Sequence, residues 1–386
     1  MPLLPELSMH RRSRRTSPAF RPWLPVRRMT GGAFVVAAVL AAGCASSKKA
    51  EAPRTDVASL YGKDAAYAVG VTQSLSFEDA VRHRTLKPLI WYPVAPSTPV
   101  DDRAPSDVFK PFYGAKDAPL SDAQARWPLV LLSHGSGGSG IDLSWFGAHL
   151  AAHGFIVLSL NHPGNSYKDT SPEGFARAYE RPKDFTVILD QLLKDPTWGP
   201  RVDPERIGAS GHSMGGYTAM ALVGLRLNLE WIEKRCTTPG TREEIGCEAL
   251  RDVDYRRIDM KESRASYLDP RVKAAFAMAP GMAASFEAQD TADIQKPVEL
   301  ILAKGDELMP HQEHGMQLSG RLPPATTTTV VLEEAGHFTF LPECYPKGFE
   351  VIAMLCKDPV AGTRGASQSR TKAEGVTFFR RTLDVR

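Results

Sequence analysis

The sequence contains a serine, an aspartate and a histidine whose order and surroundings could support acyl transfer: Ser213, Asp306 and His337. Ser213 lies at the centre of Gly-His-Ser-Met-Gly, between a short apolar run and a helical pattern over 216–225. A serine on such a strand-to-helix turn projects its hydroxyl into a cleft, and the two glycines leave room for the turn. The bare motif also arises by chance, so it is the strand-turn-helix setting that predicts a nucleophile.

A serine nucleophile needs a general base, and the base needs an acid that orients it. Asp306 follows the apolar run 298–303, at the strand end where an acid would point into the cleft, although an aspartate there is also common turn chemistry. His337 follows the run 328–332 and is, of the ten histidines, the one that comes after both other members at a strand end. We therefore expect Asp306 to hold His337, and His337 to take the proton of Ser213.

The glycine-rich loop 134–140 provides the second part of the expected chemistry. In acyl transfer the attacked carbonyl oxygen becomes an oxyanion, and two backbone N–H groups aimed at it stabilise that charge. We expect one donor to be the N–H of Met214, which follows the nucleophile, and the other to be the N–H of Ser136. The alternatives are a phosphate-cradling loop, whose Lys-Ser/Thr ending is missing here, and a simple connection.

A sheet must position these residues, and the hydrophobic pattern predicts one. Apolar runs typical of strands alternate with helical patterns, which implies an α/β fold with a mostly parallel sheet, helices on both faces and the active site at the carboxyl ends of the strands. The first two strands look antiparallel, and 95–126 is rich in Pro and Asp and is expected to be a loop. Strands are expected at 67–77, 85–93, 127–133, 155–160, around 207–209, 272–279, 298–303 and 328–332, and helices at 143–153, 181–194 and 216–225.

Residues 228–269 have no place in a minimal sheet. They are interpreted as a cap or lid over the cleft, with a plain surface insertion as the alternative. The segment is more charged than a lid that opens on an oil surface, since Glu230, Glu233, Lys234 and Arg235 lie close together. It therefore favours soluble esters with short acyl chains over long triglycerides.

The composition fits one large catalytic domain, since 42% of the 386 residues are hydrophobic and 24% are charged. We expect a leader at 1–44, a flexible tether at 45–64 and the catalytic domain at 65–386. The net charge of +3 is small and owes much to arginines near the N-terminus, so nothing suggests nucleic-acid binding.

The leader combines several arginines with an apolar run, AFVVAAVLAAG, that is too short to span a membrane. Leu-Ala-Ala-Gly-Cys at 40–44 resembles a bacterial lipobox, in which Cys44 becomes the lipidated N-terminus; the alternative is an ordinary signal peptide. The true start is Met9 or later if the long basic segment is not translated, and Arg27-Arg28 also permits a twin-arginine route. We expect an exported protein of the cell envelope whose membrane contact is the lipid anchor, or otherwise a secreted one.

Beyond Cys44, four cysteines remain in two close pairs: Cys236 with Cys247, and Cys344 with Cys356. An oxidising compartment favours a disulfide within each pair, and free buried thiols are the alternative. No Cys-x-x-Cys motif or His-rich cluster suggests a metal site.

Several longer segments resemble known hydrolases. The sequence resembles bacterial proteins called predicted dienelactone hydrolases, is similar to plasma-type platelet-activating-factor acetylhydrolases and, more distantly, to cutinase-like polyester hydrolases. The resemblance implies an α/β-hydrolase fold and serine esterase chemistry. It rests on LIWYP, PLVLLSHGSGG, HLAAHGFIVLSLNHPG, the RP-x-D at 181–184, DPERIGASGHSMGGYTAM and AGHFTFL.

Two departures refine what the resemblance implies. The plasma acetylhydrolases carry the acid at the end of the strand after the elbow helix, where this sequence has Ala279 and Pro280, so the acid must come from the following strand, as in polyester hydrolases. True dienelactone hydrolases resemble a cysteine version of the motif. We therefore expect a serine esterase that acts on a small-molecule ester through an acyl-enzyme without a cofactor, with an amidase or peptidase, or an inactive envelope binding protein, as alternatives.

Overall fold

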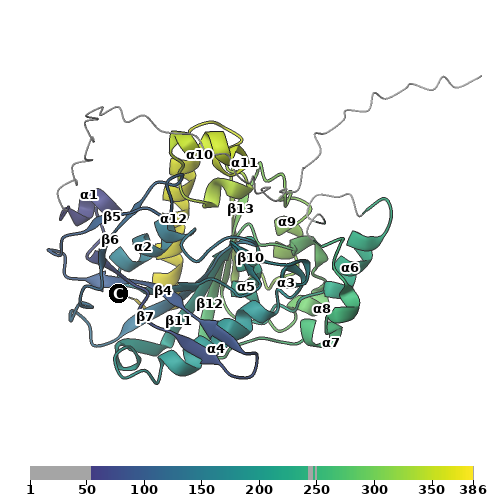
Figure 1. The fold of residues 1–386 in the computed structure, drawn as a ribbon, viewed down its shortest axis with the longest axis horizontal. Helices are drawn as coiled ribbons and strands as arrows, with labels where there is room; N and C mark the ends of the chain where they lie inside the picture. Colours follow the sequence, from purple (N-terminus) through teal and green to yellow (C-terminus); the bar gives the residue numbers. More distant parts are fainter. Residues whose placement is uncertain (1–53, 242–246, 248–249, 386) are drawn as a thin grey trace, which may run out of the picture. The chain divides into compact units, whose positions relative to one another are not determined.

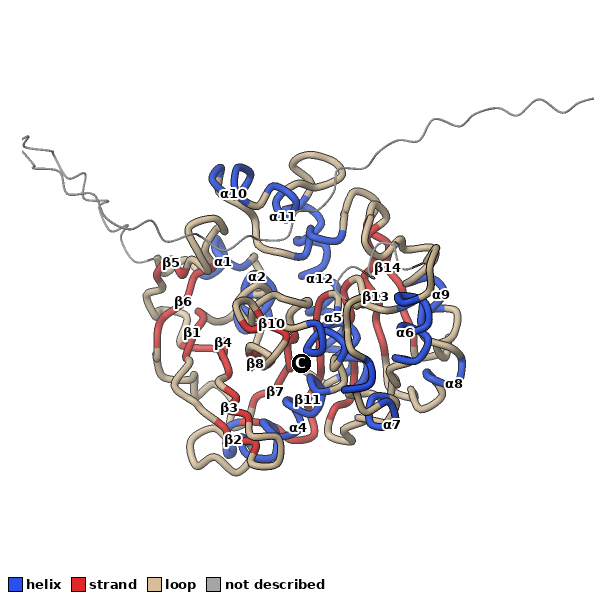
Figure 2. Tube along the Cα trace, turned by 45° about the vertical axis from the view of Figure 1, so that its right-hand side comes forward, coloured by secondary structure: helices blue, strands red, loops and turns tan. Residues whose placement is uncertain are grey.

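A ten-stranded sheet organises the folded part of the chain (Figures 1 and 2). The computed structural model describes residues 54–241, 247 and 250–385. The strand order is β14-β13-β12-β11-β7-β8-β4-β1-β6-β5. The strands are β1 (Ala68–Thr72), β4 (Pro88–Val94), β5 (Asp101–Arg103), β6 (Phe112–Lys116), β7 (Trp127–Ser133), β8 (Ile156–Leu160), β11 (Val202–His212), β12 (Val272–Met278), β13 (Val298–Ala303) and β14 (Thr327–Leu332); β2 (Phe77–Asp79) pairs with β3 (Arg84–Leu86), and β9 (Asn165–Ser166) with β10 (Asp169–Thr170).

Strand direction explains where the candidate residues meet. From β8 through β7, β11, β12 and β13 to β14, each neighbouring pair is parallel, whereas β4 is antiparallel to β8 and β1 is antiparallel to β4. The carboxyl ends of parallel strands lie at the same edge of a sheet. The loops after β7, β11, β13 and β14, which hold Ser136, Ser213, Asp306 and His337, therefore lie along one edge.

Helices cover both faces of the sheet, and each face has its own hydrophobic core. Leu129 and Leu131 of β7 join one core, and Val130 and Leu132 join the other, as the period of two in a strand requires. The first core packs under α4 (Glu180–Leu192) and α5 (Met214–Ala221), and the second under α2 (Ser144–Ala152) and α12 (Arg364–Thr382). The predicted mostly parallel sheet with helices on both faces is confirmed.

The shorter helices connect these layers or lie at the edges of the sheet. They are α1 (Val57–Tyr61), α3 (Pro172–Ala176), α6 (Leu229–Thr237), α7 (Met260–Ser263), α8 (Ala288–Thr291), α9 (Gly315–Ser319), α10 (Pro346–Val351) and α11 (Ala353–Cys356), with the 3-10 turns η1 (Gly199–Arg201), η2 (Tyr255–Arg257), η3 (Ala283–Ser285) and η4 (His337–Phe340). None of the helices in the described part of the chain has both the length and the apolarity that crossing a bilayer requires.

Three expectations about the elements need correction. The segment 95–126 is not only a loop, because it contains β5 and β6, and β6 extends the sheet by pairing parallel to β1. Both strands are short and lie among Pro and Asp residues, so no long apolar alternation marks them. The first strand stops at Thr72 rather than continuing to 77, and α12 was not predicted at all.

Part of the predicted tether is ordered. Residues 54–64 belong to the folded unit, because Arg54 pairs with Val100 and α1 begins at an aspartate cap, where Asp56 accepts the N–H of Ser59. Tyr61 is buried and donates its hydroxyl to the carbonyl of Tyr113. The expected leader at 1–44 and the candidate lipidation residue Cys44 lie outside the described residues.

The insertion 228–269 is anchored in the main core. Leu229 and Ile232 of α6 are buried there together with Ile258, and Asn228 caps α6 by accepting the N–H of Trp231. Cys236 and Cys247 form a disulfide within the insertion, and the second expected disulfide, between Cys344 and Cys356, is also present.

Candidate active site

Ser213 occupies a sharp turn between β11 and α5. Its backbone has φ of 56°, a left-handed conformation that non-glycine residues adopt only when their surroundings enforce it. The turn is tightly packed: a Cβ on Gly211 would lie 2.3 Å from the carbonyl oxygen of Gly215, and one on Gly215 would lie 1.9 Å from that of Ser133. Only glycine fits at either position, as the sequence predicts, and Ser213 itself is half-buried.

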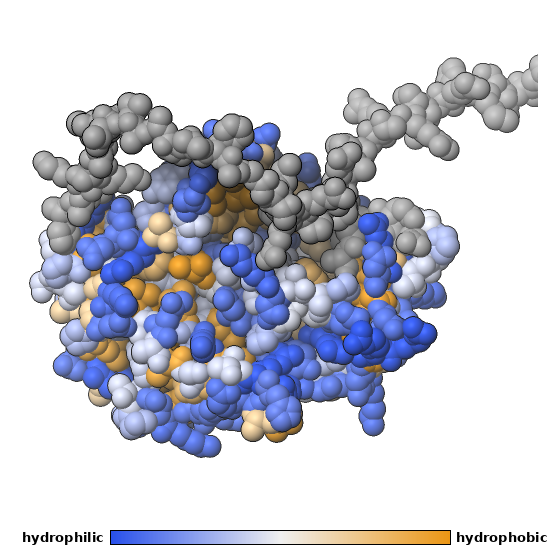
Figure 3. All heavy atoms as spheres, viewed as in Figure 1, coloured by the Kyte–Doolittle hydropathy of each residue, from blue (hydrophilic) through white to orange (hydrophobic). Residues whose placement is uncertain are grey.

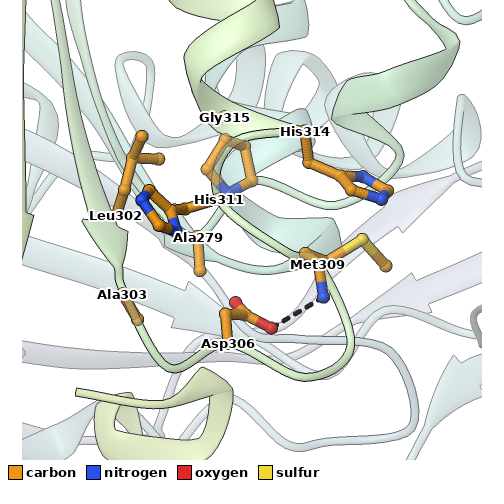
Figure 4. Close-up of a pocket in the computed structure, with 9 residues that line it drawn as sticks. Ala279, Leu302, Ala303, Asp306, Met309, His311, His314 and Gly315 are labelled. Atoms are coloured by element: carbon orange, nitrogen blue, oxygen red, sulfur yellow. Dashed lines mark hydrogen bonds between the residues drawn. The ribbon is translucent and has the colours of Figure 1, made fainter. Parts of the chain in front are cut away.

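The three residues that the sequence singles out form one line of hydrogen bonds. Nε2 of His337 lies 3.0 Å from Oγ of Ser213, and Nδ1 of His337 lies 2.8 Å from Oδ2 of Asp306. The other oxygen of Asp306 accepts the N–H groups of Leu308 and Met309, at 3.0 and 2.7 Å. Figure 4 shows the bond from Met309 beside the carboxylate. Asp306 is thus fixed on one side by backbone donors and presents its other oxygen to the histidine.

The loop that carries His337 is braced from outside the sheet. Pro359, which follows α11, fits against the loops of the acid and the base, because a Cβ on Gly305 would lie 2.7 Å from its ring and one on Gly336 would lie 2.9 Å from it. The disulfide between Cys344 and Cys356 closes the segment between these contacts. The loops of the candidate acid and the candidate base are therefore packed against the same segment.

His212 packs directly against the candidate base, with ring centroids 4.8 Å apart. Burial, and then the neighbouring His337, lower the pKa of His212 well below its ordinary value, so it is neutral at physiological pH. A neutral ring next to His337 adds apolar contact without a second positive charge. The structure thus places His212 in the packing of the turn, against His337 and Phe340.

The two expected oxyanion donors flank the nucleophile. Met214 is the first residue of α5, so its N–H is free of the helix ladder. The loop of Ser136 passes beside the nucleophile, because a Cβ on Gly135 would lie 3.5 Å from Cβ of Ser213. Within the described residues, neither the N–H of Met214 nor that of Ser136 donates a hydrogen bond. Both are available to an oxygen on the substrate.

A polar network beneath this loop was not predicted as part of the site. Nε2 of His162 lies 2.9 Å from Oγ of Ser133, and Nδ1 of His162 lies 2.9 Å from Oδ2 of Asp184. Arg181 reaches the same cluster and donates to the carbonyls of His134 and Gly135. The signal in the sequence was the RP-x-D at 181–184, which carried a resemblance but whose role depends on contacts between distant segments.

A cavity of about 510 Å³ lies between the insertion and the segment after Asp306. Its apolar wall includes Trp231, Met282, Leu308 and Met309, and charged side chains such as Glu307 also line it. A smaller pocket, drawn in Figure 4, adjoins Asp306 and shares Met309 and His314 with the larger one. The insertion therefore forms one side of a cavity near the candidate acid, although Ser213 does not line it.

No group of three or more His, Cys, Asp or Glu in the described part of the chain is arranged to hold a metal ion. His149 of α2 and His153, which follows the last residue of α2, lie side by side, but Nδ1 of His153 is hydrogen-bonded to the carbonyl oxygen of His149.

Comparison with known proteins adds three findings. A family model described as "Alpha/beta hydrolase family" matches residues 129–349. The chain is 38% identical over 80 residues to Lipase 1 of Moraxella sp. (strain TA144), covering 21% of this chain and 22% of that protein. It is 30% identical over 103 residues to Cutinase 2 of Thermobifida cellulosilytica, covering 26% of this chain and 36% of that protein. The matches thus span only about a third or less of these relatives.

A solved structure, a ferulic acid esterase from Streptomyces cinnamoneus, resembles the whole domain. The TM-score is 0.58 at 23% identity, and the match covers 83% of this chain and 91% of that chain. At this identity the likeness concerns the fold alone.

Proposed function

Since the chain belongs to the alpha/beta hydrolase family, we propose that it is a serine hydrolase that cleaves carboxylic esters through an acyl-enzyme on Ser213. The observation that carries this proposal is the line of hydrogen bonds from Asp306 through His337 to Ser213, with a strained, partly exposed serine at its end. The relatives are named as a lipase, a cutinase and a ferulic acid esterase, which supports ester chemistry over amide chemistry.

In the first half of the reaction, Oγ of Ser213 attacks the ester carbonyl carbon while its proton passes to Nε2 of His337. The electron pair of the carbonyl double bond moves onto its oxygen, which the N–H groups of Met214 and Ser136 receive. The tetrahedral species then collapses, the bond to the leaving oxygen breaks, and His337 returns the proton to the departing alcohol. The acyl group remains on Ser213.

Water completes the cycle by the same route. His337 takes a proton from water, the resulting hydroxide adds to the acyl carbon, and the bond to Oγ of Ser213 breaks as the proton returns to the serine. Asp306 accepts the Nδ1 hydrogen of His337 throughout, which keeps Nε2 free to accept a proton and stabilises the charged ring.

A fluorophosphonate probe tests the mechanism directly. The purified protein should be labelled once, and peptide mapping should place the label on Ser213, with no labelling of a folded Ser213→Ala variant. An unlabelled, folded wild-type protein without esterase activity would favour the inactive binding protein. Faster turnover of matched anilides than of esters would favour an amidase or peptidase.

We propose soluble esters with short acyl chains as the substrates. Leu229 and Ile232 of the insertion point into the core, whereas Glu230 and Lys234 are exposed, so α6 offers no broad apolar outer face to an oil surface. Figure 3 shows hydrophilic side chains over much of this side of the molecule. An added methylene that is not buried forfeits about 0.8 kcal/mol of possible binding.

A chain-length series checks this substrate class. We expect p-nitrophenyl acetate to butyrate to exceed the decanoate in kcat/KM. A profile that rises steadily to long chains, with activation at an oil-water interface, would replace this proposal with a lipase. The finer resemblance to acetylhydrolases stays a prediction that the same series addresses.

We also propose that the protein is exported and anchored through a lipid on Cys44. The two disulfides support an oxidising compartment. Metabolic labelling with a radioactive fatty acid should mark the wild-type protein and not a Cys44→Ser variant. Labelling of the Cys44→Ser protein at the wild-type level would show that Cys44 is not the anchor site.

A further inference from the structure

Arg181 lies beneath the loop that carries Ser136, although it belongs to the first turn of α4. Its side chain is 1% exposed. One nitrogen, Nη1, donates to the carbonyl of His134 at 2.5 Å, and Nη2 donates to the carbonyl of Gly135 at 3.2 Å. The remaining hydrogen bonds reach Oγ of Ser133 and two oxygens of Asn165. A rigid helix thus holds a guanidinium against the backbone of a glycine-rich loop.

The charge of Arg181 is retained and has no carboxylate in contact. Burial lowers the pKa of Arg181 to about 9, which leaves it protonated at neutral pH. All its hydrogen-bond acceptors among the described residues are neutral, and the nearby Asp184 instead forms ion pairs with Arg82 and Arg84. Burying a cation without a carboxylate in contact lowers the free energy of unfolding. The buried position of Arg181 therefore indicates a benefit other than stability.

The peptide between Gly135 and Ser136 links this cation to the nucleophile. The described part of the chain contains no cis peptide, and in a planar trans peptide the C=O and the following N–H point in opposite directions. A group that holds the carbonyl of Gly135 on one side therefore aims the N–H of Ser136 to the other side. Donation to that carbonyl also polarises the peptide and makes its N–H a stronger donor.

Two further donors reach the same carbonyl. Nδ1 of His134 lies 2.6 Å from the oxygen of Gly135, and the N–H of Gly138 lies 3.2 Å from it. The other ring nitrogen of His134 accepts the N–H of His162, so the neutral ring carries its proton on Nδ1. Burial and the charge of Arg181 hold the pKa of His134 well below its ordinary value, which keeps this tautomer at neutral pH. Three donors, from Arg181, His134 and Gly138, thus hold the carbonyl of Gly135.

From this geometry we propose that Arg181 is the positioning residue of the oxyanion hole: it holds the carbonyl of Gly135 so that the N–H of Ser136 faces, and binds more strongly, the oxyanion that forms on the substrate. The proposal rests on the esterase mechanism above. Arg181 touches no substrate and acts through one peptide group. Its benefit should be small for bound substrate and large for the tetrahedral species, because the negative charge exists only there.

The test compares Arg181→Lys and Arg181→Met with a control that contacts the same helix, Arg271→Met. Arg271, which directly precedes β12, bonds Asp190 and the carbonyl of Thr186 on α4 and also pairs with Asp269. None of its hydrogen bonds reaches the glycine-rich loop, so its loss loosens α4 and the start of β12 without removing a contact to that loop. Lysine keeps the charge and loses the fork that reaches two carbonyls. The probe is 1,1,1-trifluoro-2-butanone, to whose carbonyl Ser213 adds while its proton passes to His337, leaving an oxyanion. The matching alcohol, 1,1,1-trifluoro-2-butanol, forms no adduct.

We expect Arg181→Met to lower kcat and to raise the inhibition constant of the ketone by the same factor, about ten to a hundred, since loss of a complete oxyanion donor costs about 10² to 10³ in kcat. KM and the inhibition constant of the alcohol should stay within about twofold, and Arg181→Lys should fall between wild type and Arg181→Met. Arg271→Met should leave both ligands unchanged. Equal weakening of ketone and alcohol, or the same loss in Arg271→Met, would show a merely structural role and overturn the proposal.

If the Arg181 variants do not fold, a second pair of variants tests the same peptide group. In His134→Asn the side-chain amide can replace the Nδ1 donor to Gly135, whereas His134→Leu removes it. The ketone should bind more weakly to His134→Leu than to His134→Asn by about tenfold, a part of the loss expected for a whole donor. Equal binding would overturn the proposal. Wild-type labelling at Ser213 is established first, so a failure of the esterase mechanism itself is seen before any variant is compared.

Discussion

Ser213, His337 and Asp306 at the edge of the sheet have a buried counterpart in Ser133, His162 and Asp184. In both relays the histidine meets the serine through Nε2 and the aspartate through Nδ1. The two distances are 3.0 and 2.8 Å in the first relay and 2.9 and 2.9 Å in the second. Hydrogen-bond geometry alone therefore does not distinguish the candidate catalytic relay from the buried one.

The serines differ in backbone and in access. Ser213 sits at φ of 56° on a turn and is partly exposed, whereas Ser133 ends the extended strand β7 and is 0% exposed. Oγ of Ser133 also accepts a bond from Arg181, which would oppose an attack by that oxygen. Exposure and free donors for an oxyanion, more than the relay itself, therefore make one serine a candidate nucleophile.

The aspartates differ in what surrounds them. Asp306 receives two backbone N–H groups, while Asp184 is 0% exposed and faces the guanidinium groups of Arg82 and Arg84. The buried relay is therefore part of a charge cluster that joins α4 to the strands. We interpret the buried relay as a structural network that holds the glycine-rich loop in place.

The largest effect separates the two serines. Ser213→Ala should lower kcat/KM for p-nitrophenyl acetate by roughly 10⁴ or more, because it removes the attacking oxygen. Ser133→Ala should leave turnover within about tenfold, while the unpaired, buried His162 nitrogen lowers the free energy of unfolding by about 1 to 3 kcal/mol. Steady-state kinetics and urea unfolding of both variants check this. Similar losses of turnover in the two would break the distinction drawn between the relays.

The aspartates should divide in the same way. Asp306→Asn should reduce kcat by roughly 10³ to 10⁴, since an amide favours the wrong tautomer of His337. Asp184→Asn should reduce kcat by less than about tenfold, because the relay that it joins reaches the substrate only through the loop. Glu307→Ala is the control, as Glu307 follows Asp306 and does not contact His337. Greater damage from Glu307→Ala than from Asp306→Asn would reassign the acid.

The two relays also differ in how their histidines are held, because His337 lies on a loop braced by a disulfide and His162 lies just after β8. Cys344→Ser with Cys356→Ser should lower the free energy of unfolding by about 3 kcal/mol, the chain-entropy value for a loop of about a dozen residues. Activity should be lost at a lower temperature than in a protein with Cys236→Ser and Cys247→Ser, whose disulfide lies in the insertion. Thermal inactivation curves of both double variants measure the difference. Identical curves would show that the second bridge does not support His337.

The Ser213 relay could be predicted from the sequence because each of its members has a local signal. Ser213 lies in a five-residue motif, and Asp306 and His337 follow apolar runs whose observed strands, β13 and β14, end at the expected residues. The order of these strands in the sheet then brings the three together. Local patterns sufficed because parallel strands end at one edge.

The buried relay could not be found in that way. His162 and Asp184 share no local motif with Ser133, and Arg181 bonds Gly135, which lies 46 residues away in the chain. β5 and β6 were missed because strands of three and five residues carry too little alternation to be recognised. Such elements are defined by partners distant in sequence.

The smallest effect concerns the pH dependence of the buried relay. Burial, opposed by Arg84 and Arg82, raises the pKa of Asp184 from 3.8 to about 6. Between these values the folded protein holds a proton on Asp184 that the unfolded chain has lost, so this group makes the wild type less stable as pH rises from about 4 to about 6. Asp184→Asn lacks the titration. As pH rises from about 4 to about 6, the unfolding free energy of Asp184→Asn should therefore increase relative to that of the wild type. The increase is at most about 3 kcal/mol, because the pKa shift is about two units and each unit is worth 1.36 kcal/mol.

Urea unfolding of wild type and Asp184→Asn at several pH values between 4 and 7 measures this shift, and the difference between the two proteins cancels the carboxylates that they share. The contribution of Asp184 should be fully present below about pH 4 and lost above about pH 6. A shift of the opposite sign would mean that Arg82 and Arg84 outweigh burial and hold the carboxylate ionised. The buried relay would then be a cluster of strong ion pairs. Asp184 would be ionised over the whole range, and its titration would no longer distinguish the buried relay from the Ser213 relay.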